Sequence, residues 1–161
     1  MVPSVGSDVA PFEDWTAAAR GALAFLHGHV GLDVWMLTRV AGEEQIVLVA
    51  HPRELVPAGV AVPWDQSFCR RMIVGAGPRV STVTAATPAY ANLLTGHAER
   101  VAAYVGVPLM TRDDTVFGTL CGVSRRAQPR SLARSLPVVE MTARMLSTVL
   151  ALTGPDAPDD R

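Results

Sequence analysis

Two cysteines and four histidines are the side chains with the widest chemical scope in this chain of 161 residues. Cys69 and Cys121 lie far apart in the sequence and neither belongs to a Cys-x-x-Cys pair, which fits buried thiols in a reducing compartment better than a disulfide framework. His27 and His29 are two residues apart on an expected helix, so they do not share a face and are poor joint metal ligands. The sequence therefore predicts no metal site and no catalytic residue.

The basic residues are all arginines, because the sequence contains no lysine. This excludes Schiff-base and P-loop lysine chemistry. The arginines are dispersed and the formal net charge is -1, so no basic stripe predicts a nucleic-acid partner. No apolar run approaches the roughly 18 residues of a membrane span, and the N-terminus shows no secretory pattern. We expect a cytoplasmic protein without a membrane partner.

Any functional site must be positioned by regular elements, and the clearest of these lie in residues 103–126. This segment predicts two strands around a polar turn at Asp113 and Asp114. Both faces of the first strand are nearly free of charge, so we expect this strand to be covered on both sides. Glycines 106, 118 and 122 mark either a close approach of backbone or ligand, or a bulge. Both interpretations stay open.

Upstream, residues 12–29 predict a helix with Pro11 in its first turn, and residues 34–40 and 45–50 predict a hairpin. Residues 66–74 predict a short helix capped by Asp65, and residues 79–83 an edge strand. A second short helix follows from Thr87 and Pro88 to Gly96.

The last expected helix, residues 135–152, carries two apolar stripes. One stripe contains Leu136, Val139, Ala143, Leu146 and Leu150, and the other contains Val138, Thr142, Met145, Val149 and Leu152. A helix that is apolar beyond one face needs a second partner. That partner is either the first helix of the same chain or the equivalent helix of a second copy.

Several of these segments resemble a GAF domain, the small-ligand sensor module of signalling proteins. The resemblance is carried by Tyr104-Val-Gly-Val-Pro-Leu109 and Val116-Phe-Gly-Thr-Leu-Cys-Gly122, preceded in the expected order by residues 67–71, 77–80 and 87–90. It implies an α+β fold in which an antiparallel sheet of five or six strands carries long terminal helices on one face and a lid of short helices on the other. The upstream order resembles GAF domains found near diguanylate cyclase and phosphodiesterase modules.

The resemblance covers residues 13–153 as a single domain, with a mobile segment at 1–12 and a disordered acidic tail at 154–161. It implies a mostly apolar pocket, and the strand and lid positions predict these ligand-binding residues: Trp64, Cys69, Met72, Tyr90, Tyr104, Gly106, Leu120 and Gly122. The expected polar groups of this pocket are the hydroxyls of both tyrosines, the Trp64 indole, Ser67 and Thr119. A flat, partly aromatic small molecule suits such a pocket, although its identity is open.

The resemblance implies a sensory domain that forms a homodimer through its terminal helices and acts on a downstream signalling domain or protein. Two alternatives remain. The first is a dimer scaffold that binds no ligand. The second is an enzyme similar to the free methionine sulfoxide reductases, in which Cys69 on the lid and Cys121 on the floor would converge, although the acidic and cysteine pattern of those enzymes is absent.

Overall fold

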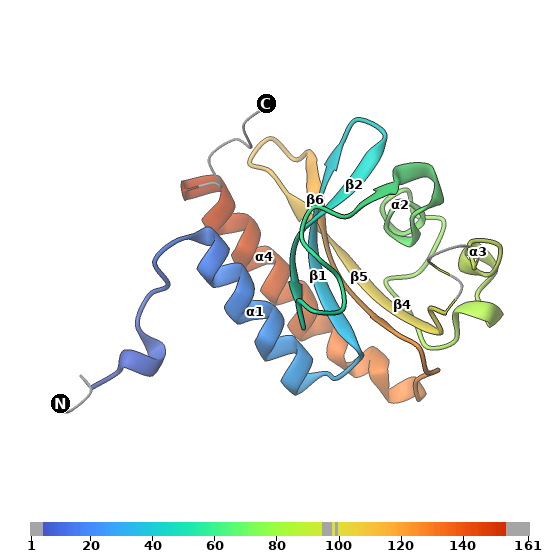
Figure 1. Ribbon diagram of the computed structural model, residues 1–161, viewed down its shortest axis with the longest axis horizontal. Coiled ribbons are helices and arrows are strands. Elements are labelled where there is room, and N and C mark those ends of the chain that lie inside the picture. The colour runs from blue at the N-terminus through green and yellow to red at the C-terminus, as the bar shows by residue number, and fades with distance from the viewer. Residues whose placement is uncertain (1–4, 95–97, 99, 154–161) are drawn as a thin grey trace.

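The computed structural model describes residues 5–94, 98 and 100–153 and has the predicted α+β fold (Figure 1). Its strands are β1 (Val34–Ala41), β2 (Glu44–His51), β3 (Ala61–Pro63), β4 (Val80–Ser81), β5 (Ala103–Met110) and β6 (Val116–Ser124). They form one antiparallel sheet in the order β3-β2-β1-β6-β5-β4. The predicted hairpins at 34–50 and 103–126 are confirmed, and residues 79–83 supply the expected edge strand.

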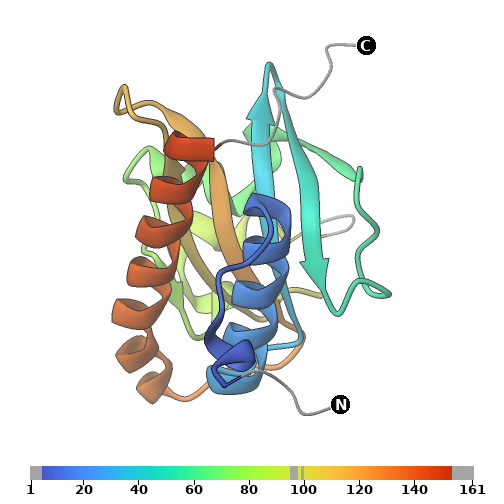
Figure 2. The ribbon, with the colours of Figure 1, turned by 90° about the vertical axis from the view of Figure 1, so that its left-hand side faces the viewer.

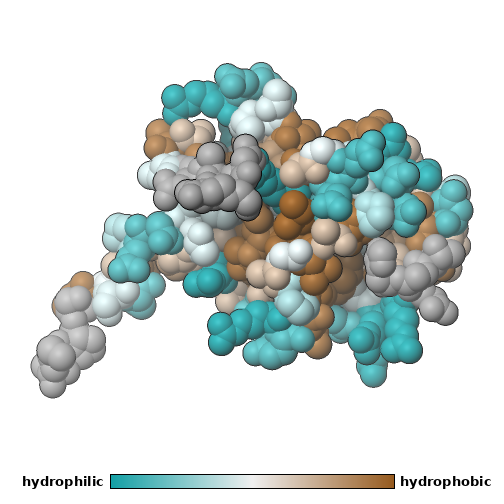
Figure 3. Space-filling view, turned by 45° about the horizontal axis from the view of Figure 1, so that its top comes forward, coloured by the Kyte–Doolittle hydropathy of each residue, from teal (hydrophilic) through white to brown (hydrophobic). Residues whose placement is uncertain are grey.

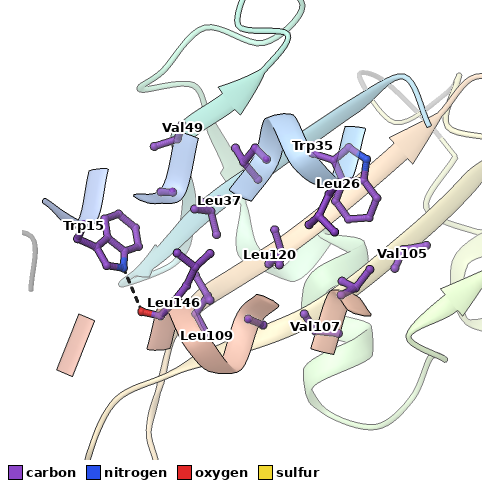
Figure 4. Packing of buried hydrophobic residues seen from close by; sticks show 14 of the residues in the cluster. Trp15, Leu26, Trp35, Leu37, Val49, Val105, Val107, Leu109, Leu120 and Leu146 are labelled. Carbon is purple, nitrogen blue, oxygen red and sulfur yellow. Dashed lines mark hydrogen bonds between the residues drawn. The ribbon is translucent and has the colours of Figure 1, made fainter. Parts of the chain in front are cut away.

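Two long helices, α1 (Trp15–His29) and α4 (Leu136–Thr153), lie side by side across one face of this sheet (Figure 2). The core beneath them contains Val105, Val107 and Leu109 from β5, and Leu120 from β6 (Figure 4). Trp15 joins the two helices, because its indole Nε1 donates to the Leu146 carbonyl at 3.1 Å. This is the larger of the two layers that enclose the sheet.

The stripe Val139, Ala143 and Leu146 of α4 is buried against the sheet, whereas Met141, Met145 and Leu152 are exposed. By length and composition alone, the segment Arg130–Thr153 is apolar enough to cross a membrane. This corrects the expectation that no apolar segment approaches the length of a membrane span. The buried stripe belongs to the protein core, but most of the segment is not buried, so the core explains only part of its apolar composition.

Short elements cover the opposite face: η2 (Trp64–Gln66), α2 (Phe68–Ile73), η3 (Thr84–Ala86) and α3 (Pro88–Ala91), all to the right of the sheet in Figure 1. Two further 3-10 helices, η1 (Ser7–Val9) and η5 (Arg130–Ser135), precede α1 and α4. The sequence did not predict β3, because its three residues lie in a proline-rich segment without alternation. They pair with β2 residues 44–46.

The sequence placed two helix starts incorrectly. The first helix begins at Trp15, with the Asp14 carboxylate accepting from the Ala17 amide at 2.8 Å, so Pro11 precedes the helix. The lid helix α2 is capped by Ser67, whose hydroxyl accepts from the Cys69 amide, and not by Asp65. In both cases the capping side chain stands directly before the first helical residue. The second short helix ends at Ala91, earlier than the predicted end at Gly96. The predicted tail at 154–161 and the start of the segment 1–12 lie outside the described residues.

Candidate functional site

A cavity of about 440 Å³ lies against the sheet face that α2 covers. Strands β1, β2, β5 and β6 supply its floor, and α2 and the connection between β2 and β3 supply most of its sides. The residues that line it are Met36, Thr38, Gln45, Val47, Leu55, Val56, Pro57, Val60, Val62, Ser67, Phe68, Cys69, Ala98, Val101, Tyr104, Cys121 and Val123. Most of these side chains are apolar, which gives the cavity the character expected of a small-molecule site.

Two of the residues predicted from the sequence, Cys69 and Tyr104, line this cavity. Trp64, Met72 and Tyr90 instead pack beside it, in a cluster with Phe68. The Tyr90 hydroxyl donates to the Pro78 carbonyl at 2.5 Å, and its ring lies 5.3 Å from that of Tyr104. These three residues therefore pack against the lining residues and do not themselves line the cavity.

Leu120 and Gly122 lie on the helix-covered face, which corrects their prediction as pocket residues. Leu120 is paired with Val107 and Gly122 with Val105, and paired residues in an antiparallel ladder point to the same face. The sequence does not specify the register across the turn, and the ladder shifts register between Leu109 and Met110. Thr119, Cys121 and Val123 consequently face the cavity side.

The three glycines of β5 and β6 do not leave empty space for a ligand. A β-carbon at Gly106 would overlap the Tyr104 hydroxyl, and one at Gly122 would lie 2.8 Å from the Trp35 ring. At Gly118 the obstacle is the backbone carbonyl of Thr38. Close approach by protein atoms therefore explains Gly106 and Gly122, whereas Gly118 combines a close approach with the neighbouring register shift of the ladder, so both interpretations apply there.

A chain of hydrogen bonds crosses the polar end of the cavity. Ser67 Oγ donates to Gln45 Oε1 at 2.5 Å. Gln45 Nε2 donates to the hydroxyls of Thr38 and Thr119, at 2.9 and 3.1 Å. Thr119 Oγ1 in turn donates to Cys69 Sγ at 3.3 Å. Thr38 and Gln45 were missed from the sequence, although a glutamine and a threonine within apolar strands are a usable signal of buried polar bonding.

Cys69 is the acceptor at which this network ends. Its sulfur also accepts from the Tyr104 hydroxyl at 3.2 Å. The neighbouring Cys121 thiol, then the hydroxyls of Thr119 and Tyr104, lower the pKa of Cys69 from its ordinary value of 9.0 to about 6, against the opposing effect of burial. The pKa of Cys121 is raised well above its ordinary value by the hydrogen bond to Cys69 and by burial. Of the two thiols, Cys69 is the one that ionises near neutral pH.

A polar groove of about 850 Å³ adjoins the cavity and shares Leu55, Val56, Val101 and Val123 with it. We call it the arginine groove, because Arg100, Arg125 and Arg126 line it together with a single carboxylate, Asp33, among its described residues. The groove therefore brings charged residues next to the cavity. Arg79, by contrast, forms an ion pair with Glu140 of α4.

The comparisons with known proteins are structural only, since no family model and no curated protein matches the sequence. The GAF domain of A. aeolicus nlh2 in an inactive state matches with a TM-score of 0.66 and 15% identity, over 89% of this chain and 88% of that one. The second GAF domain of DevS from Mycobacterium smegmatis matches with a TM-score of 0.60 and 17% identity, over 86% and 97%.

Free methionine-R-sulfoxide reductase from Neisseria meningitidis, in complex with its substrate, also matches. Its TM-score is 0.64 at 18% identity, over 88% of this chain and 81% of that one. At such identities a shared fold is compatible with different functions. Element order, sheet topology and these matches together confirm the expected architecture: the chain has the fold of GAF domains.

Proposed function

We propose that this chain is a sensory or regulatory domain that binds a small molecule in its apolar cavity. The observation that carries the proposal is the cavity itself, about 440 Å³ in volume, with apolar sides and hydrogen-bonding groups gathered at one end. This volume lies within the range of about 300–1,000 Å³ that is usual for small-molecule sites. The fold supports the proposal, because it is shared with GAF domains.

The lining favours a compact, largely apolar ligand. The aromatic rings of Phe68 and Tyr104, with centroids 5.6 Å apart, offer contacts to a flat molecule. A highly charged nucleotide is disfavoured, because no arginine is among the described lining residues and burial of unpaired charge is costly. A ligand with one anionic group would reach the arginine groove with that group and the cavity with its apolar part.

A structural change caused by ligand binding in the cavity is transmitted to the terminal helices through β5. One face of this strand presents Tyr104 to the cavity, and the other packs Val105 and Val107 beneath the helices. The Met110 amide at the end of β5 donates to Ser147 Oγ of α4 at 3.0 Å. A ligand signals in this way only if it binds two arrangements of the domain with different affinities.

Native mass spectrometry of the protein from its host tests the receptor function. We expect an additional non-covalent mass that is lost on denaturation. Val56→Trp, which places a large side chain at the mouth of the cavity, should abolish the additional mass, because Val56 lines both cavity and groove. Val74→Trp is the matched control, since Val74 is exposed and does not line the cavity.

An unaltered ligand signal in Val56→Trp would place the ligand elsewhere. A ligand-free wild type that also shows no stabilisation by small-molecule libraries would favour the scaffold alternative.

We further propose that the chain forms a homodimer through the exposed side of α4. Met141, Met145 and Leu152 are each more than half exposed there, at spacings that place them along one side of the helix. Exposed apolar side chains aligned along a helix mark interaction sites. A separate group of hydrophobic residues lies in the middle of the face drawn in Figure 3, within a hydrophilic border, and it is not part of this helix surface.

Sedimentation measurements at several protein concentrations test the dimer. Met145→Glu should convert a dimer to a monomer, because a buried unpaired carboxylate opposes association. Arg144→Gln at the adjacent exposed position also lowers the net charge by one and therefore controls for charge alone. A wild type that stays monomeric at every concentration would contradict the dimer and leave the cavity proposal intact.

Reductase activity is the second candidate function, and one observation favours it: Cys69 and Cys121 line the same cavity. A catalysed reduction would consume a thiol reductant in the presence of free methionine sulfoxide and would require Cys69. We expect no such turnover, because the cavity walls offer few polar groups to a zwitterionic amino acid.

A further inference from the structure

The surroundings of the Cys69 sulfur favour its reaction as a nucleophile, and reversible ligand binding would not require this property. The sulfur lies on α2 at the polar end of the cavity, beside Cys121 of β6, and the described residues include no group of three metal-binding side chains that would employ it as a ligand. A thiol in an ordinary apolar wall is inert, because burial opposes its ionisation. The Cys69 sulfur differs from such a thiol because two hydroxyl groups and a second thiol point at it.

The direction of the hydrogen bonds shows that these donors are fixed. The Gln45 carbonyl accepts from Ser67, which orients its amide group towards the two threonines. The oxygens of Thr38 and Thr119 therefore act as acceptors for Gln45. The Thr119 proton is left to point at Cys69, where it meets the sulfur at 3.3 Å. Thr38 completes the chain by donating to Thr119 at 2.6 Å.

Fixed donors around one atom stabilise negative charge on it. The network thus has the form of an anion site built around the Cys69 sulfur inside an otherwise apolar space. All its members are buried, and Thr38, Thr119 and Tyr104 are at most 1% exposed. Such an arrangement keeps the thiolate away from bulk water while it faces whatever occupies the cavity.

We propose that Cys69 is a covalent capture site for small, largely apolar α,β-unsaturated carbonyl compounds. The inference rests on the proposed receptor function, because the electrophile must enter the same cavity. The apolar walls select an organic electrophile of this kind over a small polar oxidant such as hydrogen peroxide. Addition also suits an enclosed site, since it releases no leaving group.

The reaction balances without an oxidant or a reductant. The Cys69 thiolate supplies an electron pair to the β-carbon, and the carbon–sulfur bond forms as the π pair of the C=C bond moves to give an enolate. The proton that the thiol lost is returned to the α-carbon, so that S–H has added across C=C. As the sulfur loses its charge, the Tyr104 and Thr119 hydroxyls are freed to donate to the enolate oxygen.

The test is the rate and position of adduct formation with 2-cyclohexen-1-one, followed by intact mass and peptide mapping. We expect one adduct per chain at Cys69, none in Cys69→Ser, and an adduct still present in Cys121→Ser, whose hydroxyl can replace the donor. Cyclohexanone, which has the same shape without the C=C bond, should slow adduct formation by competition.

Tyr104→Phe separates an activating role from a structural one, because it removes one hydroxyl donor and keeps the ring. If loss of this hydroxyl raises the pKa of Cys69 by about one unit, the rate of adduct formation at pH 6 falls about fivefold, while the rate at pH 9 is unchanged. A structural defect would lower both rates equally.

Modification of both cysteines at the rates seen in denatured protein would overturn the proposal. So would the absence of any adduct in folded protein whose denatured form reacts. If cyclohexanone still binds in that second case, covalent capture fails and the receptor function stands. A Cys69–Cys121 disulfide, formed in place of the adduct, would also overturn it.

Discussion

Replacing Gly118 by alanine is expected to destabilise the fold by about 3 kcal/mol, the upper end of the range for overpacked sites. Gly118 is buried in β6, between Arg39 of β1 and Leu109 of β5. A β-carbon there would overlap the carbonyl oxygen of Thr38. Backbone in the middle of a sheet cannot rotate away as a side chain can, so the strands must separate.

Denaturant unfolding of Gly118→Ala measures this loss. The control is Gly28→Ala in α1, where a β-carbon meets no atom within 4 Å. We expect this control to be neutral or stabilised by up to about 1 kcal/mol, because alanine is the better helix former. Equal stability of Gly118→Ala and wild type would show that β1 and β6 do not pack as described.

The free energy of unfolding is expected to rise between pH 6 and pH 9. In the folded protein Cys69 loses its proton near pH 6, whereas in the unfolded chain it keeps the proton until about its ordinary value of 9.0. Within this window the unfolded state binds more protons, so stability increases with pH, by at most about 1.4 kcal/mol per pH unit for one group. The contribution is lost as the pH falls through 6.

Above pH 9 the slope should reverse. Cys121 and Tyr104 both have a raised pKa in the folded state, through the hydrogen bond to Cys69 and burial for the cysteine, and mainly burial for the tyrosine. The unfolded chain then loses their protons first, and stability falls with pH.

Urea unfolding of the wild type and Cys69→Ser across this pH range checks both slopes, and the ultraviolet absorbance of the thiolate follows Cys69 directly. Below pH 9 the difference between the two proteins reports mainly on Cys69, whereas above pH 9 it also contains the changed titration of Cys121 and Tyr104, because Cys69 contributes to both of their pKa shifts. Parallel stability curves would show that Cys69 does not ionise in the folded state.

The layers of the fold were predictable because periodicity reports burial. Val105, Val107 and Leu109 alternate along β5, and all three lie beneath the helices as expected. Trp15, Ala19 and Leu26 recur at helical spacing, and all three are buried in α1.

The site was predictable only in part, because it depends on register. The correct choice between Leu120 and Cys121 as a cavity residue requires the pairing of β6 with β5, which the length of the turn does not reveal. The cavity floor also includes Thr38 of β1 and Gln45 of β2, which belong to the predicted hairpin. Their hydrogen bonds to Thr119 of β6 form only when that hairpin pairs with the later one, and local sequence contains no information about this contact.

The bond between Trp15 and Leu146 has a consequence for anything attached to this fold. Helices α1 and α4 run in opposite directions, so the beginning of the first lies beside the end of the second (Figure 1). The chain before α1 turns back along that helix, where Phe12 lies against Gly21, so it leads away from the end of α4 (Figure 1). A twist of α4 on the sheet would therefore move the start of α1 with it through the Trp15–Leu146 bond.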